Sequence, residues 1–149
     1  MALIDLSDLP QGPILALDPG SKTIGVASCG ATRGLATPVE TIQRTKFTAD
    51  AARIFQLYDE RKAVGLVIGL PYNMDGTEGA RAQSSRALAR NLLGLRDIPI
   101  LFQDERLSTF EATEALISAG MRRDRRKEVI DAHAAANILR SVLDRLEHL

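Results

Sequence analysis

The sequence has no tryptophan, and only 4% of its 149 residues are aromatic. Proteins that bind single-stranded nucleic acid by base stacking depend on aromatic side chains, so this scarcity argues against a stacking platform. The chain also has a single cysteine, Cys29, which excludes an internal disulfide framework and a cysteine-rich zinc site. Low cysteine usage is typical of proteins in a reducing compartment, so we expect a cytoplasmic location.

The sequence also lacks a net charge and a long hydrophobic run. Lysine plus arginine and aspartate plus glutamate both number 19, so a nucleic-acid partner would have to be held by a local basic patch. No apolar run is long enough to span a bilayer, and residues 1–12 carry acids where a signal peptide has a basic region. We therefore expect neither a signal peptide nor a membrane partner.

The order of predicted elements is that of an α/β domain. Apolar runs of strand length predict strands near 13–18, 23–29, 35–42, 63–70 and 98–102. Amphipathic segments predict helices near 48–62, 80–93, 109–118 and 128–147. Short connections favour antiparallel pairing of the first three strands, and the later alternation of strands and helices favours parallel pairing. We expect a mixed five-stranded sheet flanked by helices.

The length and the ordinary composition, 45% hydrophobic and 26% charged, are typical of one globular domain. We expect this domain to cover residues 1–149, with residues 1–12 as a loosely held N-terminal extension.

Acidic residues stand at comparable places in this arrangement. Asp18 ends the first predicted strand, Asp104 and Glu105 follow the last one, and Asp131 falls in the first turn of the last predicted helix. Strand ends of an α/β sheet meet at one edge, and a helix packed on the sheet can bring an aspartate there. Each acid alone is equally explained as a turn residue, a charged loop or a helix N-terminal residue.

Carboxylates that meet at one edge would repel one another, and a bound cation would relieve that repulsion. Hard carboxylate oxygens suit Mg²⁺ or Mn²⁺. Such ions activate water and neutralise charge on the leaving oxygen when phosphodiester bonds are cleaved. The pattern therefore suggests a metal-dependent nuclease.

Four segments, in this order, together resemble the YqgF/RuvX family of Holliday-junction-resolvase-like nucleases: LALDPGSKTIGVA, VIGLPYNMDGTEG, DERLST and DAHAAANIL. The resemblance covers about residues 14–139. It implies a ribonuclease-H-like fold, a Mg²⁺- or Mn²⁺-dependent site, and a hydrolase that matures the 5′ end of pre-16S rRNA. Carried over by position, the family's acids fall on Asp18, Glu105 and Asp131, with Asp104 as a neighbour.

Several residues are candidates for binding the substrate phosphates. Lys22 follows Asp18 in a short turn, although it is equally explained as a surface lysine. Asn73 opens a polar loop that leads to a helix N-terminus, where free N–H groups favour an anion. Arg106 adjoins the acids and would either bind a phosphate or neutralise Asp104.

A basic stretch, MRRDRRK, occupies positions 121–127 and is predicted to form a loop. Its candidate substrate contacts are Arg122, Arg123, Arg125 and Arg126. Contacts of this kind position a nucleic-acid backbone and carry little sequence information. The alternative is a solvated loop without a partner.

Three functions remain open at this point. The first is a nuclease acting on an rRNA precursor, and the second is a Holliday junction resolvase acting on four-way DNA junctions. The third is a catalytically weak nucleic-acid-binding assembly factor. A resolvase needs two sites for paired nicks, so the oligomeric state, monomer or homodimer, bears on the choice. An actin-like ATPase is set aside because that architecture places one nucleotide between two domains.

Overall fold

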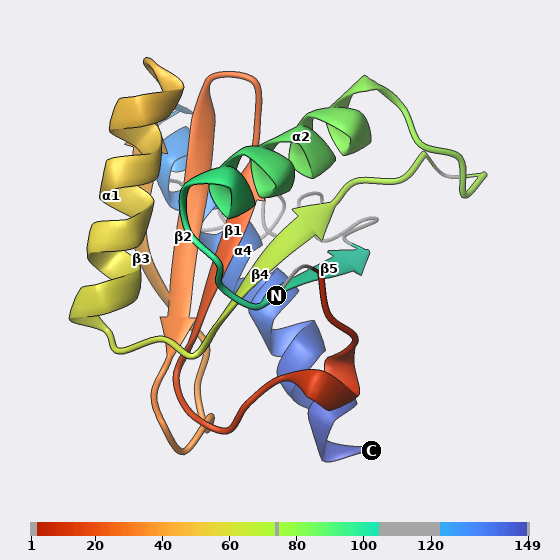
Figure 1. Ribbon diagram of the computed structural model, residues 1–149. Coiled ribbons are helices and arrows are strands. Elements are labelled where there is room, and N and C mark those ends of the chain that lie inside the picture. The colour runs from red at the N-terminus through yellow and green to blue at the C-terminus, as the bar shows by residue number, and fades with distance from the viewer. Residues whose placement is uncertain (1–2, 74, 105–122, 149) are drawn as a thin grey trace.

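The computed structural model describes residues 3–73, 75–104 and 123–148, with side chains of the last range described from Asp131 onward (Figure 1). In chain order the elements are η1 (Leu6–Asp8), β1 (Ile14–Pro19), β2 (Thr23–Cys29), β3 (Thr37–Gln43), α1 (Phe47–Glu60), β4 (Gly65–Leu70), α2 (Ala80–Leu95), β5 (Ile100–Asp104) and α4 (Arg123–Glu147). The helix predicted over 109–118 lies outside the described residues. Within the described part of the chain, no helix is both long and apolar enough to cross a membrane.

The five strands form one sheet in the order β3-β2-β1-β4-β5. Strand β2 pairs antiparallel with both β1 and β3, whereas β1 pairs parallel with β4 and β4 with β5. This confirms the predicted mixed sheet with three antiparallel strands at its start. Pro38 lies on the edge strand β3, close to a register shift between Val26 and Ala27, which is where a residue without an N–H donor is tolerated.

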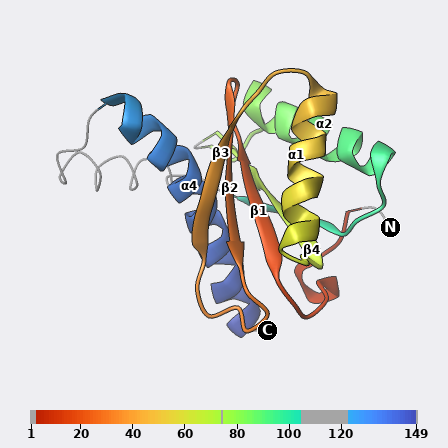
Figure 2. The same ribbon diagram turned by 90° about the vertical axis from the view of Figure 1, so that its left-hand side faces the viewer.

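Helices cover both faces of the sheet, α1 and α2 on one side and α4 on the other (Figure 2). The strands supply both cores by alternation, because successive side chains point to opposite faces. In β1, Leu15 and Leu17 pack with α1 and α2, whereas Ile14 and Ala16 pack with α4. Cys29 belongs to the α4 core, and its burial raises the pKa of its thiol.

The N-terminal segment is part of the core rather than a loose extension. Ile4, Leu6 and Leu9 are each 8% exposed and pack in the α4-side core. The Ile4 N–H donates to the Ile100 carbonyl at 2.9 Å. The expectation of a loosely held extension is wrong for residues 3–12, because three of their side chains bury apolar surface in the core. Polar residues between these three interrupt the apolar pattern, so the sequence does not indicate a packed segment.

Positions 123–127 of the basic stretch are helical where a loop was expected. Helix α4 begins at Arg123, so the backbone of positions 123–127 belongs to it. Arginine and lysine are good helix formers, and no glycine or proline separates this stretch from the rest of the helix. The prediction is wrong because it took charge density as a sign of a loop. Asp131 consequently lies more than two turns into α4, not in its first turn.

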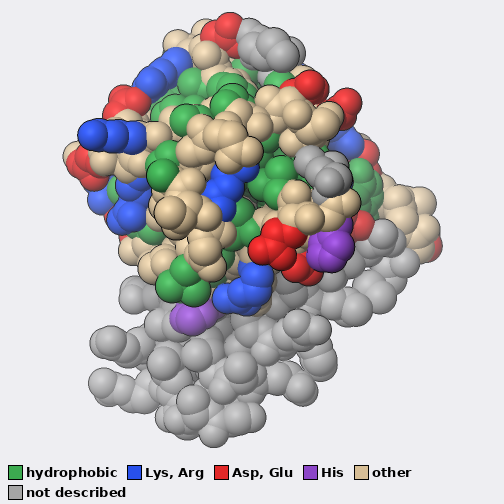
Figure 3. Space-filling view, turned by 90° about the horizontal axis from the view of Figure 1, so that it is seen from below, with side chains coloured by type: hydrophobic (Ala, Val, Ile, Leu, Met, Phe, Trp, Pro, Cys, Tyr) green, Lys and Arg blue, Asp and Glu red, His purple; other side chains and the backbone are tan. Residues whose placement is uncertain are grey.

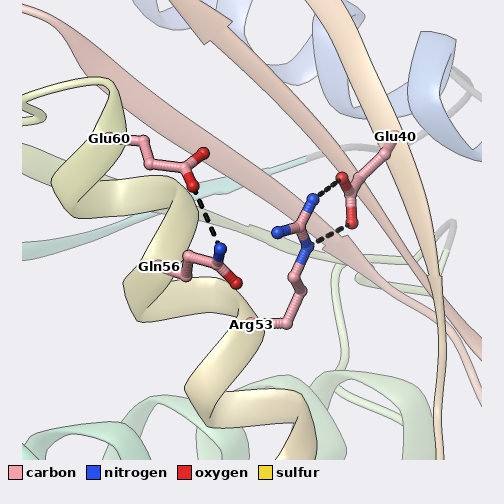
Figure 4. A network of polar contacts seen from close by, with 4 residues as sticks. All are labelled: Glu40, Arg53, Gln56 and Glu60. Carbon is pink, nitrogen blue, oxygen red and sulfur yellow. Dashed lines mark hydrogen bonds and ion pairs between the residues drawn. The ribbon is translucent and has the colours of Figure 1, made fainter.

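An ion pair links α1 to the edge strand β3 (Figure 4). Arg53 of α1 donates from Nε and Nη2 to the two carboxylate oxygens of Glu40 on β3, at 2.9 and 2.5 Å. Such two-point pairing of arginine and carboxylate fixes both position and orientation. It holds the pKa of Glu40 below its ordinary value, with the Arg53 hydrogen bond as the main cause.

Candidate active site

Asp18 is a buried carboxylate near the end of the central strand. Its side chain is 7% exposed, and by alternation along β1 it lies on the α4 face with Ile14 and Ala16. Oδ1 of Asp18 is 4.0 Å from Nη2 of Arg81, which lies in the first turn of α2. Burying a carboxylate is costly unless it gains partners. A core strand gains no stability from an aspartate, so Asp18 is a candidate functional residue.

Helix α4 packs against β2 at the residue opposite Asp18. The register of β1 and β2 pairs Asp18 with Gly25, and directly opposed residues in an antiparallel pair point to the same face. A Cβ atom added to Gly25 would lie 1.8 Å from the carbonyl oxygen of Asp131 and 3.2 Å from the nitrogen of Ala132. Only glycine allows this approach of helix to strand. The close contact brings Asp131 of α4 to the position beside Asp18.

Thr23 holds the Asp131 side chain. The Thr23 hydroxyl donates to Oδ2 of Asp131 at 2.7 Å, a short bond to a carboxylate. Thr23 is the first residue of β2 and lies two positions before Gly25, hence on the same face of the sheet. Strand β2 therefore contributes both the space for α4 and the donor that orients its carboxylate.

Asp104 lies on the opposite face of the sheet from Asp18. It is the last residue of β5 and pairs with Leu70 of β4. Ile100 and Phe102 pack with α1 and α2, whereas Leu101 packs with α4, so alternation groups Asp104 with the former pair. Asp104 and Asp18 therefore do not share a face, and the role of Asp104 as a neighbour of the site stays a prediction.

The other acid and most of the predicted arginines are not described. Glu105, Arg106 and Arg122 lie outside the described residues, and so do the side chains of Arg123, Arg125 and Arg126. Of the three predicted acids, the structure thus describes Asp18 and Asp131, and both adjoin Gly25.

Lys22 lies exposed in the turn between β1 and β2, as the sequence predicts. Two arginines support this turn. Arg44 donates from Nη1 to the Gly20 carbonyl at 2.6 Å, and its backbone N–H donates to the Lys22 carbonyl at 2.9 Å. Arg81 donates from Nη2 to the Pro19 carbonyl at 3.4 Å. Three cationic residues therefore share one short turn next to Asp18.

Asn73 makes its described contacts within its own loop. Its backbone N–H donates to the Thr77 carbonyl at 2.7 Å, and its side-chain amide donates to the Thr77 hydroxyl at 3.0 Å. The Thr77 hydroxyl and N–H donate in turn to Asp75, which holds the pKa of Asp75 below its ordinary value. The loop shapes the entry to α2, and a substrate contact by Asn73 stays a prediction.

The donor set at this edge suits a hard divalent ion. Asp18 and Asp131 supply carboxylate oxygens from two elements, one of them buried, which is the ligand type that Mg²⁺ and Mn²⁺ take. Among the described residues no group of three His, Cys, Asp or Glu side chains comes together that could hold a metal ion.

Sequence reasoning missed four residues of this arrangement: Thr23, Gly25, Arg44 and Arg81. A glycine inside a strand often marks a close backbone approach, so Gly25 carried a usable signal. The side-chain contacts of Thr23, Arg44 and Arg81 link residues from separate elements. No local pattern in the sequence reports such contacts.

The RuvX family model, described as Holliday junction resolvase, matches residues 12–145. Proteins from Phenylobacterium zucineum (strain HLK1) and Caulobacter vibrioides (strain NA1000 / CB15N) are 54% and 53% identical over the full length of both chains. A protein of Bradyrhizobium sp. (strain ORS 278) is 58% identical over 93% of this chain and 86% of its own. All three carry the name "Putative pre-16S rRNA nuclease".

Solved structures of Holliday junction resolvases share the fold. RuvC of Thermus thermophilus, in complex with a Holliday junction substrate, has a TM-score of 0.54 at 13% identity over 90% of this chain and 95% of its own. The yeast mitochondrial resolvase Ydc2 has a TM-score of 0.54 at 13% identity, over 96% and 84%. These likenesses confirm the ribonuclease-H-like fold. With the family model matching nearly its whole length, the chain belongs to the RuvX family.

Proposed function

We propose that this protein is a metal-dependent nuclease that hydrolyses phosphodiester bonds in the 5′-end maturation of pre-16S rRNA in the cytoplasm. The observation that carries the proposal is the convergence of Asp18 and Asp131 beside Gly25. The family membership and the names of the relatives at 53–58% identity support the same reaction class.

Asp18 and Asp131 would hold Mg²⁺ or Mn²⁺, with Glu105 as the third ligand. Strand β5 directs Leu101 toward α4, and period-two alternation predicts the same face for Gln103 and then Glu105. Thr23 keeps one Asp131 oxygen engaged and so fixes the direction of its carboxylate. When bound, the ion would activate a water molecule and neutralise charge on the leaving oxygen.

Basic and polar side chains would position the substrate backbone around these acids. We assign this role to Lys22 and Asn73 and to the arginines at 106, 122, 123, 125 and 126. The stretch 123–127 begins the same helix that carries Asp131. A nucleic-acid backbone held along the start of α4 would therefore lead to the acids.

The test is a cleavage assay on a pre-16S rRNA precursor with Mg²⁺ or Mn²⁺. We expect Asp18→Asn and Asp131→Asn each to lower cleavage more than about a hundredfold, since loss even of an outer-shell partner costs 10–100-fold. Asp144→Asn is the matched control, because Asp144 is an exposed acid of the same helix. Cleavage by Asp18→Asn at the parent rate would refute the assignment of the site.

The description of the family as Holliday junction resolvase supports a second substrate, the four-way DNA junction. Assaying a junction and the rRNA precursor side by side, with one enzyme preparation, separates the two. Faster cleavage of the precursor supports the proposal, and faster paired nicking of the junction would replace it. Tight binding without cleavage in any divalent metal would instead indicate an assembly factor.

A further inference from the structure

The turn between β1 and β2 gathers three cations from three parts of the chain. Lys22 belongs to the turn itself, Arg44 lies between β3 and α1, and Arg81 lies in the first turn of α2. Both arginines are fixed by carbonyl oxygens of this turn, at Gly20 and Pro19. Lys22, Arg44 and Arg81 together form the turn surface.

The turn surface lies on the edge of the sheet that carries the candidate acids. Figure 1 shows this turn at the top of the molecule, level with the beginning of α1, and Figure 2 shows the first half of α4 on the other side of the sheet. Nη2 of Arg81 is 4.0 Å from Oδ1 of Asp18, so the surface begins at the candidate site itself. From there it extends toward α1, away from the basic beginning of α4.

Arg44 of the turn surface differs from other arginines in the described part of the chain. Arg53, Arg86 and Arg96 each hold a carboxylate with two hydrogen bonds, so their charges are neutralised by Glu40, Glu78 and Asp59. Arg44 instead donates to a backbone carbonyl, which orients the guanidinium and leaves its full charge.

A guanidinium has five N–H donors. The hydrogen bond from Arg44 to the Gly20 carbonyl uses one of the five. Side-chain exposure of Arg81 is 57%, and Lys22 is also exposed. Arg44 is half-buried. Oriented cations that are exposed or partly exposed fit phosphate groups of a polynucleotide backbone. On the opposite edge, seen from below in Figure 3, acidic and basic side chains are interspersed with hydrophobic and neutral ones.

We infer that Lys22, Arg44 and Arg81 bind the phosphates of the nucleic-acid substrate on the α1 side of the candidate acids. This inference rests on the proposed nuclease function and extends it. The substrate backbone would cross the sheet edge from the beginning of α4, past Asp18 and Asp131, to the turn surface. Contacts of this kind place the scissile bond without reading sequence.

The test measures binding without catalysis. A fluorescein-labelled RNA hairpin with a single-stranded 5′ extension is titrated with the full chain in EDTA, by fluorescence anisotropy over a series of salt concentrations. We expect Lys22→Gln, Arg44→Gln and Arg81→Gln each to weaken binding about three- to tenfold at low salt. Each should also reduce the slope of log K against log salt by about 0.7 to 0.9, the contribution of one phosphate contact.

Arg33→Gln is the matched control. Arg33 is also held by backbone carbonyls, those of Gly12 and Pro10, but it follows β2 at the other end of the sheet. Its replacement should leave both the affinity and the slope at the parent values. A loss with Arg33→Gln as large as that with Arg44→Gln would overturn the inference, because any surface cation would then serve.

Arg44→Lys separates phosphate binding from support of the turn. If the charge at position 44 binds phosphate, Arg44→Lys keeps the parent slope of log K against log salt. Its melting temperature should equal that of Arg44→Gln, because both variants lose the hydrogen bond to the Gly20 carbonyl. Unchanged slopes in the Arg44→Gln and Arg81→Gln variants would refute the turn surface, even if affinity falls. Since no divalent ion is present, failure of the nuclease proposal appears in the cleavage assay and not here.

Discussion

Gly25 lies directly against the backbone of Asp131, in the strand position that pairs with Asp18. A Cβ atom at Gly25 would be 1.8 Å from the Asp131 carbonyl oxygen and 2.4 Å from its carbonyl carbon. The register of β1 and β2 places Asp18 opposite the same glycine. Because Gly25 has no side chain, α4 can approach the sheet closely at this point. The same approach places the backbone of Asp131 next to the strand position that pairs with Asp18.

Replacing Gly25 by alanine is expected to displace α4. A contact with backbone atoms cannot be relieved by a rotamer change, so we expect a loss of about 3 kcal/mol in the free energy of unfolding, the upper part of the range for overpacking. Cleavage should fall together with stability. Chemical denaturation measures the first effect. Gly30→Ala is the control, because apart from its chain neighbours no atom of the described residues lies within 4 Å of its added Cβ, and it should stay within about 0.5 kcal/mol of the parent.

Replacing Thr23 by valine removes the donor to Asp131 and keeps the side-chain shape. We expect cleavage or Mn²⁺ affinity to fall about 10- to 100-fold, because a ligand without its outer partner loses orientation. Thr23→Ser retains the hydroxyl and should recover most of the loss. Mn²⁺ titration followed by calorimetry is the measurement. Equal Mn²⁺ affinities for the valine variant and the parent would contradict a positioning role for Thr23.

The ion pair between Glu40 and Arg53 should stabilise the fold in a pH-dependent way. The pKa of Glu40 is lowered from 4.5 in the folded protein, chiefly by the Arg53 hydrogen bond. A carboxyl group with a depressed folded pKa contributes stability above its unfolded pKa and loses it as the pH falls through the folded value. The parent should therefore be more stable than Arg53→Gln at neutral pH, and the difference should shrink below about pH 4.5.

Glu40→Gln provides the comparison for this experiment. With no carboxyl group at position 40, adding Arg53→Gln to it should change the melting temperature equally at all pH values. A difference between parent and Arg53→Gln that grows as the pH falls would show that another group is responsible.

Much of the fold follows from local patterns in the sequence. Apolar runs and the short turn at Pro19 predict the strands and their antiparallel start, and these predictions are confirmed. The errors fall where local patterns are ambiguous. The high charge density at 123–127 led to a predicted loop where the structure has a helix. Isolated apolar residues along 3–12 led to a predicted loose extension where the structure has a packed segment. The packing of 3–12 depends on tertiary contacts that no short window of sequence contains.

Asp18 is visible in the sequence because a carboxylate at a strand end is unexpected in a core, and Asp131 because it lies in a helix expected to pack on the sheet. Their supporting contacts are not visible. The bond from Thr23 to Asp131 joins residues 108 positions apart, and the bond from Arg81 to Pro19 joins residues 62 positions apart. Such pairs become evident only when β2, α2 and α4 are placed in space.

The central claim is that Asp18 and Asp131 bind one divalent ion together. The most direct measurement is a crystal structure of the full chain grown with Mn²⁺, with anomalous data collected at the manganese edge. We expect an anomalous peak within about 2 to 2.5 Å of a carboxylate oxygen of each residue. A protein that cleaves RNA with Mn²⁺ in solution but shows its manganese peak away from both carboxylates would contradict it.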